Sequence, residues 1–208
     1  MLKQLKPVFM VFLLLTVVTG IVYPLLVTGV AQLVFPEKAN GSLMRSEGGY
    51  AGSDLIGQPF DDPKYFWGRL SATPDFPYNS ASSSGSNMGP SNPALVEAVK
   101  ARVEALQKAD PGNQSSIPID LVTSSGSGLD PHISPAAALY QASRVARFRG
   151  LSEERVRALV DQFTEPRQWG LLGEPRVNVL RLNLALDGLQ GQGKSSSPPF
   201  SLGGIGVK

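Results

Sequence analysis

The chain has 208 residues, of which 42% are hydrophobic, 8% aromatic and 17% charged, and its formal net charge is +2. It contains no cysteine and one histidine, His132, which excludes disulfides, thiolate metal sites, cysteine nucleophiles and multi-histidine metal sites. A net charge this small does not by itself indicate nucleic-acid binding. We therefore expect no metal and no nucleic-acid partner.

Residues 7–35 form a charge-free apolar run near the N-terminus. A bilayer core about 30 Å thick needs ~20 apolar residues in a helix, and this run is longer. It predicts one membrane-spanning helix, with Pro24 at a point where such a helix tolerates a kink. The apolar core of a signal peptide has only about 7–15 residues. A retained anchor is therefore favoured over cleavage near Ala31, which would release a secreted binding protein.

The charges beside this run predict its orientation. Lys3 and Lys6 precede it, and the first charge after it is Glu37. The positive-inside rule places such an N-terminus in the cytoplasm and the remainder outside. We expect localisation in the plasma (inner) membrane, in contact with lipid. The expected organisation is a cytoplasmic N-terminus and transmembrane anchor (1–36), one extracytoplasmic domain (37–187) and a flexible Gly/Ser/Pro-rich tail (188–208).

The first half of the soluble chain is rich in turn residues. Residues 37–63 are Gly-rich and irregular, and residues 65–71 predict a short aromatic strand. Residues 73–92 consist mainly of Pro, Ser, Asn and Gly. A loop of this length inside a compact domain tends to be functional or disordered. Its apolar side chains, including Phe76 and Tyr78, favour an ordered binding or docking loop.

Three helices are predicted in the second half. Asn92, Ser134 and Ser152 are the expected N-caps, and a proline follows the first two at the first helical position. Gly150 is expected just past the C-terminus of the second helix. The expected apolar faces are Leu95, Val99, Val103 and Leu106 on the first helix, Leu139, Ala142, Val145, Ala146 and Phe148 on the second, and Val156, Leu159, Val160 and Phe163 on the third.

Two further strands are predicted, over residues 117–123 and 180–187. The proline in the first suggests a sheet edge, and the second alternates strictly between apolar and other residues. The expected fold is therefore α+β: one N-terminal transmembrane helix, then a small domain with about three helices on a short sheet.

The tail contains a formal nucleotide-binding motif. Residues 188–195 match the pattern of a P-loop, which must lead directly into a helix that holds the phosphates. Pro198 and Pro199 follow instead, and they disrupt the first turns of such a helix. We interpret the match as an accident of a Gly-rich composition.

Ser127 and His132 suggest an alternative function, that of a membrane-anchored extracytoplasmic serine hydrolase. His132 would have to be the general base, since it is the only histidine. No serine in this segment has the G-x-S-x-G pattern of a nucleophile elbow. A structural turn before a helix start is favoured over catalysis. The expected turn residues are Ser127, Gly128, Asp130, His132 and Ser134.

Several longer motifs run through the soluble chain. They are Tyr65-Phe-Trp-Gly-Arg-Leu-Ser-Ala-Thr73, Ser84-Gly-Ser-Asn-Met-Gly-Pro-Ser-Asn-Pro-Ala-Leu95, Ser127-Gly-Leu-Asp-Pro-His-Ile-Ser134 and Leu182-Asn-Leu-Ala-Leu-Asp187. In this order they closely resemble the C-subunit (KdpC) family of the bacterial Kdp potassium-transporting P-type ATPases. The resemblance covers the anchor and the domain to about Asp187. Leu70 departs from the proline that the family motif implies, and the tail is not covered.

The resemblance implies an accessory subunit with no catalytic site of its own. Such a subunit supports assembly and acts as a catalytic chaperone that raises the ATP affinity of the hydrolysing subunit. The implied partners are a channel-like potassium-binding subunit and an ATP-hydrolysing P-type subunit. No firmly bound cofactor is implied, because the partners handle potassium and ATP is met only through the complex. Since the predicted topology places the domain opposite cytoplasmic ATP, we favour an indirect effect on a two-state complex.

Two sets of residues are candidates for these roles. Gln141 and Arg144, one turn apart on the second predicted helix, are the polar pair that a bound nucleotide would contact. Aromatic and Arg side chains dominate interface energies, so partner contacts are expected in the aromatic segment and the loop after it. Core packing is the alternative for the aromatic side chains. The candidate partner contacts are Tyr65, Trp67, Arg69, Ser84, Gly85, Asn87 and Asn92.

Overall fold

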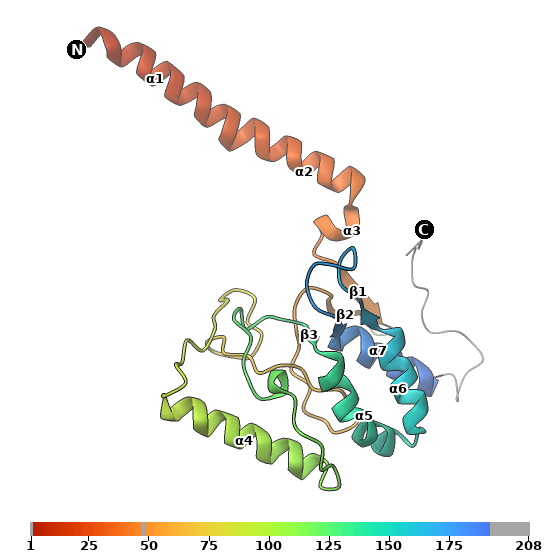
Figure 1. Ribbon diagram of the computed structural model, residues 1–208. Coiled ribbons are helices and arrows are strands. Elements are labelled where there is room, and N and C mark those ends of the chain that lie inside the picture. The colour runs from red at the N-terminus through yellow and green to blue at the C-terminus, as the bar shows by residue number, and fades with distance from the viewer. Residues whose placement is uncertain (1, 47–48, 192–208) are drawn as a thin grey trace. The chain divides into compact units, whose positions relative to one another are not determined.

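The computed structural model describes residues 2–46 and 49–191 of the chain (Figure 1). The chain divides into two compact units, with the boundary after Leu43. Of the predicted tail, residues 188–191 end the last helix, and residues 192–208 lie outside the described residues. The formal P-loop therefore begins inside a helix rather than in a loop before one.

The first unit is a long apolar helix. It consists of α1 (Leu2–Val17), the π-helical segment η1 (Val18–Val22) and α2 (Tyr23–Val34), followed by the short α3 (Pro36–Ala39). Residues Gln4–Val34 form one continuous 31-residue stretch that is apolar and long enough to cross a membrane. The predicted helix is thereby confirmed, and its length and composition suit a single membrane span.

The π-helical turn lies just before Pro24, which occupies the first turn of α2. Proline has no backbone N–H, and a π-turn is one way for a helix to accommodate the missing hydrogen bond. The hydroxyls of Thr16 and Thr19 donate to backbone carbonyls one turn earlier, at 2.8 and 2.7 Å. These bonds keep the hydroxyls satisfied in an apolar environment.

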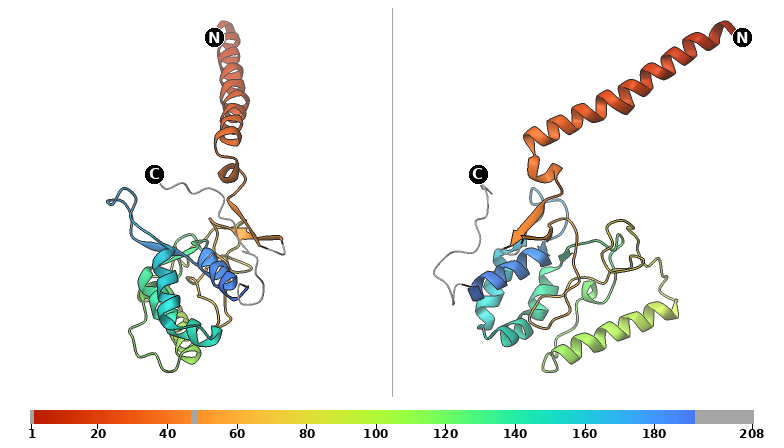
Figure 2. Two further views of the ribbon diagram at one scale, coloured as in Figure 1. Left: turned by 90° about the vertical axis from the view of Figure 1, so that its right-hand side faces the viewer. Right: turned by 180° about the vertical axis from the view of Figure 1, so that it is seen from behind.

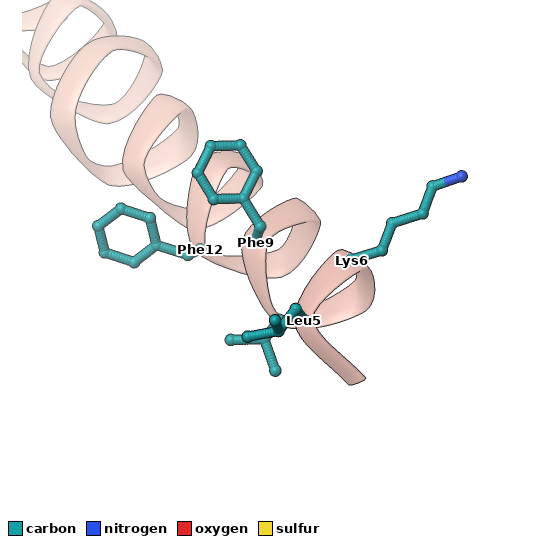
Figure 3. Close-up of a pocket in the computed structure, with 5 residues that line it drawn as sticks. Leu5, Lys6, Phe9 and Phe12 are labelled. Atoms are coloured by element: carbon teal, nitrogen blue, oxygen red, sulfur yellow. The ribbon is translucent and has the colours of Figure 1, made fainter. Parts of the chain in front are cut away.

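The start of α1 carries its bulky apolar groups on one side. Leu5, Phe9 and Phe12 project from that side, whereas Lys6 extends in another direction (Figure 3). A long basic side chain at the end of a spanning helix reaches the headgroup region while its apolar neighbours contact the lipid chains.

The second unit is a small α+β domain. Its described residues include the helices α4 (Pro93–Ala109), α5 (Pro135–Arg149), α6 (Glu153–Gln162) and α7 (Val179–Gly191), and the 3₁₀ turn η2 (Ile119–Leu121). Strands β3 (His132–Ile133), β5 (Arg176–Asn178) and β4 (Thr164–Glu165) form an antiparallel sheet in that order. Strands β1 (Leu43–Ser46) and β2 (Gly49–Ser53) form a separate two-stranded sheet.

The three predicted helices are confirmed together with their caps. The side chains of Asn92, Ser134 and Ser152 each accept a hydrogen bond from a first-turn backbone N–H, at 3.0, 3.0 and 3.3 Å. Gly150 has a φ of 64° and ends α5 in the left-handed conformation. One residue of the predicted apolar faces is wrong: Phe148 is 53% exposed.

The three predicted strands are wrong. Residues 180–187 belong to α7, and burial of Val179, Leu182 and Leu186 follows the helical rather than the alternating period. Residues 117–123 contain η2. Residues 65–71 are part of no sheet, although one of them, Leu70, makes an isolated bridge. The strands that do form have two to five residues, too few to show an alternating pattern.

The core of the second unit is built around α5, whose small residues allow α6 to pack closely against it, and the apolar side chains of α7 join the same core (Figure 2). By contrast, α4 lies at the edge of the domain and buries only Leu106 among its residues (Figure 1). Of its predicted stripe, Leu106 is buried, and Leu95, Val99 and Val103 are half-buried. The fully buried core side chains are Phe66, Leu121, Ala137, Ala138, Ala142, Val145, Val156, Val160, Val177, Leu182 and Leu186.

Phe66 and Trp67 lie in this core although no strand pairs with them. Asn183 of α7 accepts from the Phe66 N–H at 2.9 Å and donates to the Phe66 carbonyl at 3.0 Å. Gln141 of α5 makes the same two bonds to Trp67, at 2.9 and 3.1 Å. We call Gln141 and Asn183 the amide clamp. Because buried backbone groups must find partners, these two carboxamides replace the neighbouring strand that the segment lacks.

Replacing Gln141 with alanine tests the clamp. The free energy of unfolding should fall by about 2–6 kcal/mol, because two buried backbone groups lose their partner at about 1–3 kcal/mol each. The measurement is denaturant unfolding of the full-length chain in detergent. Gln107→Ala, at an exposed position of α4, is the matched control and should change stability by less than about 0.5 kcal/mol. Equal effects of the two substitutions would contradict the clamp.

Candidate functional site

Trp67, a predicted partner contact, is 6% exposed and belongs to the core. Two guanidinium groups lie over its ring, that of Arg102 from α4 at 5.1 Å and that of Arg144 from α5 at 4.5 Å from the ring centroid. Arg144 also donates to the Pro63 carbonyl and, at 2.6 Å, to Gln141 Oε1. Trp67 is therefore held by packing and cation–π contacts rather than presented to a partner.

Burial changes the electrostatics of both arginines. It lowers the pKa of Arg144 to about 10 and lowers the pKa of Arg102 as well. Both guanidinium groups stay charged at neutral pH, and they donate hydrogen bonds to backbone carbonyls. Arg102 donates to the carbonyls of Leu121 and Gly68, each at 3.0 Å. It thereby ties α4 to the segment that follows Trp67.

The polar pair proposed for nucleotide contact is buried. Gln141 and Arg144 are each 1% exposed, and their hydrogen bonds go to Trp67, Pro63 and each other. A nucleotide would have to open the core to reach them, so their contact with ATP stays a prediction. The structural role of this pair, and that of Asn183, was not predicted. Once α7 is known to be a helix, its apolar phase identifies Asn183 as inward-facing.

Two loops that were considered separately lie against each other. We call residues 71–85 and 124–130 the paired loops. The Ser84 N–H and the Ser83 hydroxyl both donate to the Ser127 carbonyl at 3.0 Å. The Ser71 hydroxyl donates to the Gly128 carbonyl at 2.7 Å. The structure thus joins candidate partner contacts to the predicted turn.

Glycine is required where the paired loops approach most closely. A Cβ on Gly85 would lie 2.7 Å from the Gly126 carbonyl oxygen. Gly128 has a φ of +69°, and a Cβ there would lie 2.5 Å from the Ser84 carbonyl oxygen. The contact is therefore made by backbone against backbone, which leaves little freedom of movement.

Tyr78 fastens the first of the paired loops. Its hydroxyl donates to the Arg69 carbonyl at 2.6 Å, and its backbone N–H donates to the Ser71 hydroxyl at 2.8 Å. Burial raises the pKa of Tyr78 to about 12, so the hydroxyl remains a donor at neutral pH. The predicted ordering of this loop agrees with these bonds, whereas its binding role stays a prediction.

Arg69, Asp130 and His132 form a polar group next to the paired loops. Arg69 pairs with Asp130 at 3.2 Å, and His132 Nδ1 lies 3.3 Å from the other carboxylate oxygen. Burial acts to raise the pKa of Asp130, but hydrogen bonds from His132 and the charges of His132 and Arg69 hold it below its usual value. The predicted turn residue Ser134 caps α5 and itself donates to Asp120 at 3.1 Å.

In this group Ser127 and His132 do not pair as a nucleophile and its base would. Ser127 Oγ accepts from the Leu129 N–H at 3.1 Å, and in the described chain it has no hydrogen bond to His132. An open cleft of about 810 Å³ runs past His132 and is lined by both acidic and basic side chains, including Arg69, Asp120 and Glu165. Within residues 2–46 and 49–191, no three His, Asp or Glu side chains gather as metal ligands would.

The remaining candidate partner contacts lie elsewhere. The Tyr65 hydroxyl donates to Asp187 at 3.1 Å, and the Arg149 guanidinium stacks on its ring at 4.7 Å. Asn87 and Asn92 are exposed, and Asn92 is engaged as the N-cap of α4. Of the seven candidates, Asn87 and Asn92 therefore have the greatest access to a partner.

Gly128→Ala tests the contact between the paired loops. The substitution should lower stability by about 1–3 kcal/mol, because the new Cβ meets backbone and the left-handed φ penalises alanine. Gly126→Ala is the control, since nothing lies within 4 Å of a Cβ there and its φ is not positive. The measurement is the midpoint of denaturant unfolding. A Gly126→Ala variant as unstable as Gly128→Ala would refute the contact.

Comparison with known proteins gives one consistent result. The model of the KdpC family, described as the c chain of the K⁺-transporting ATPase, matches residues 5–188. The potassium-transporting ATPase KdpC subunit of Methylococcus capsulatus is 62% identical over 190 residues, which is 91% of this chain and 100% of that protein.

Two further relatives are equally similar. The potassium-transporting ATPase KdpC subunit of Dechloromonas aromatica is 64% identical over 183 residues, 88% of this chain and 96% of the relative. That of Sorangium cellulosum is 62% identical over 188 residues, 90% of this chain and 99% of the relative. With the family model matched from the anchor into α7, the chain belongs to the KdpC family, the c chains of K⁺-transporting ATPases.

Proposed function

We propose that this chain supports assembly of a potassium-transporting ATPase and acts as a catalytic chaperone that raises the ATP affinity of the hydrolysing subunit. Membership of the KdpC family supports the role of an accessory subunit. Its partners in this proposal are a channel-like potassium-binding subunit and an ATP-hydrolysing P-type subunit. The chain itself binds no firm cofactor and has no catalytic site, and the partners handle potassium.

The proposal places the second unit outside the inner membrane. The 31-residue apolar helix supports single-pass anchoring, and the lysines before it favour a cytoplasmic N-terminus. A domain outside would lie opposite cytoplasmic ATP. Its effect on ATP affinity would then pass through the partners rather than through a bound nucleotide.

The observation that carries this indirect mechanism is the burial of Gln141 and Arg144. Gln141 is hydrogen-bonded to the backbone of Trp67 and Arg144 lies over its ring, and each side chain is 1% exposed. A rigid domain without an accessible nucleotide contact can still act by binding one state of a two-state complex more tightly. Coupling of this kind typically changes an affinity about 5–150-fold.

We place the partner contact on the exposed side of the paired loops and on residues 86–91, which follow the first of these loops. Asn87 and Met88 are exposed there, and the residues behind them are fixed by the bonds to the second loop. Hydrogen bonds of Tyr78 and between the paired loops, rather than exposed aromatic side chains, supply the rigidity of this surface. A rigid surface loses little conformational entropy on binding.

The test uses the full-length tagged chain, co-expressed with both partner subunits and purified in mild detergent. A P-type ATPase should co-elute, with potassium-stimulated hydrolysis. Asn87→Arg should raise the KM for ATP about fivefold or more, or abolish co-elution. Gln107→Arg, at an exposed position of α4, is the control. A chain that elutes alone from cells expressing both partners would refute the proposal, and ester hydrolysis by the lone chain would support the hydrolase instead.

A further inference from the structure

The loop between β4 and β5 exposes three large apolar side chains. Trp169, Leu171 and Leu172 are 88, 80 and 54% exposed, whereas the other tryptophan, Trp67, is 6% exposed. We call residues 167–174 the Trp loop. Neighbouring apolar side chains this exposed in a folded domain mark a contact with another molecule or with a membrane.

The Trp loop has a defined conformation. Gln168 and Leu172 exchange two backbone hydrogen bonds of 2.9 Å, and the ion pair of Arg167 with Glu174, at 2.6 Å, closes its base. Trp169 has a φ of 52°, a left-handed conformation that is uncommon for a bulky residue. The backbone therefore holds the tryptophan outward at some energetic cost, which indicates that its exposure serves a purpose.

The position of the Trp loop within the second unit suggests what it contacts. In Figure 1 the loop projects from the end of the domain where β1, its first strand, begins. The left view of Figure 2 shows the loop extending away from the body of the domain. Residues 35–42 connect the end of the apolar helix at Val34 to β1. Eight residues span at most roughly 30 Å even when fully extended. The chain length therefore limits the distance from Val34 to β1, and a bilayer that holds the apolar helix is within reach of this end of the domain.

We propose that the Trp loop inserts into the interfacial layer of that bilayer and provides a second, peripheral membrane contact. Trp is enriched at membrane–water interfaces, where its ring meets the apolar boundary and its N–H meets water. Leu171 and Leu172 add apolar area beside it. Arg167 and Arg176 lie at or next to the base of the loop, where each pairs with a glutamate, Glu174 and Glu165 respectively. The base of the loop is therefore polar and suited to the headgroup layer, below an apolar tip. This contact goes beyond the proposed subunit function and does not depend on it.

The bilayer is the preferred occupant because the chain itself brings it within reach. The apolar tip consists of three side chains on a narrow projecting loop, a shape suited to shallow insertion into a fluid layer. Insertion into a bilayer needs no matching groove, whereas a protein partner would have to provide one for this tip.

The test uses the full-length chain in phosphatidylcholine–phosphatidylglycerol vesicles, made with ordinary or with brominated acyl chains. The emission of Trp169 is the difference between the wild type and Trp169→Phe. Brominated lipid should quench most of this difference, while the Trp67 emission that remains in Trp169→Phe should persist. A second variant, Leu171→Ser with Leu172→Ser, should lose most of the quenching without a change in unfolding midpoint.

Two results would overturn the proposal. In the first, iodide in the aqueous phase quenches the Trp169 emission and brominated lipid does not, which would leave the Trp loop in water. In the second, neither agent quenches Trp169 in vesicles that hold the complex with the partner subunits. A protein partner would then cover the loop, and lipid insertion would be wrong.

Discussion

The pairing of two side-chain amides with the backbone of Phe66 and Trp67 is the interaction on which the rest of the domain depends. It connects α5 and α7 to a segment that has no partner strand. Arg144 orients one of these amides and stacks on Trp67. A buried polar network of this kind stabilises one arrangement only when its members are satisfied. The clamp meets that condition for all four backbone groups that it contacts.

The paired loops follow from the same segment. Just beyond Trp67, the Gly68 carbonyl accepts a hydrogen bond from Arg102 of α4, and the Arg69 carbonyl accepts one from the Tyr78 hydroxyl. These bonds set the path of the first loop, and its serines then meet the second loop through backbone groups. The surface proposed to contact a partner is therefore positioned by the core. Its rigidity comes from buried polar contacts more than from secondary structure.

How much of the fold could be predicted depended on how local each signal was. The helix caps at Asn92, Ser134 and Ser152 are set by residues within one turn, so the sequence pattern sufficed. In α7 the alternating leucines also satisfy a helical period, because residues 179, 182 and 186 share one face. The strand predicted at Phe66 does not form, because the backbone of this segment pairs with side chains 74 and 117 residues away. No local sequence pattern predicts hydrogen bonds between a backbone segment and side chains so far away in the chain.

The candidate site was predictable in part for the same reason. The turn before α5 shows itself by its small and polar residues. The roles of Gln141 and Arg144 could not be predicted, because helical spacing alone leaves open whether a polar pair faces solvent or the core. Their inward orientation supports the proposal that the chain acts on its partners from a distance rather than by holding a nucleotide itself. That account requires the domain to lie opposite the ATP-hydrolysing side.

The most direct test of this claim uses the absence of cysteine from the chain. Ser91→Cys introduces one thiol at an exposed position just before α4. Intact cells that express the full complex are treated with a membrane-impermeant maleimide, before or after lysis. The account predicts full labelling before lysis. Labelling only after lysis would place the domain in the cytoplasm and contradict an indirect effect from the outer side.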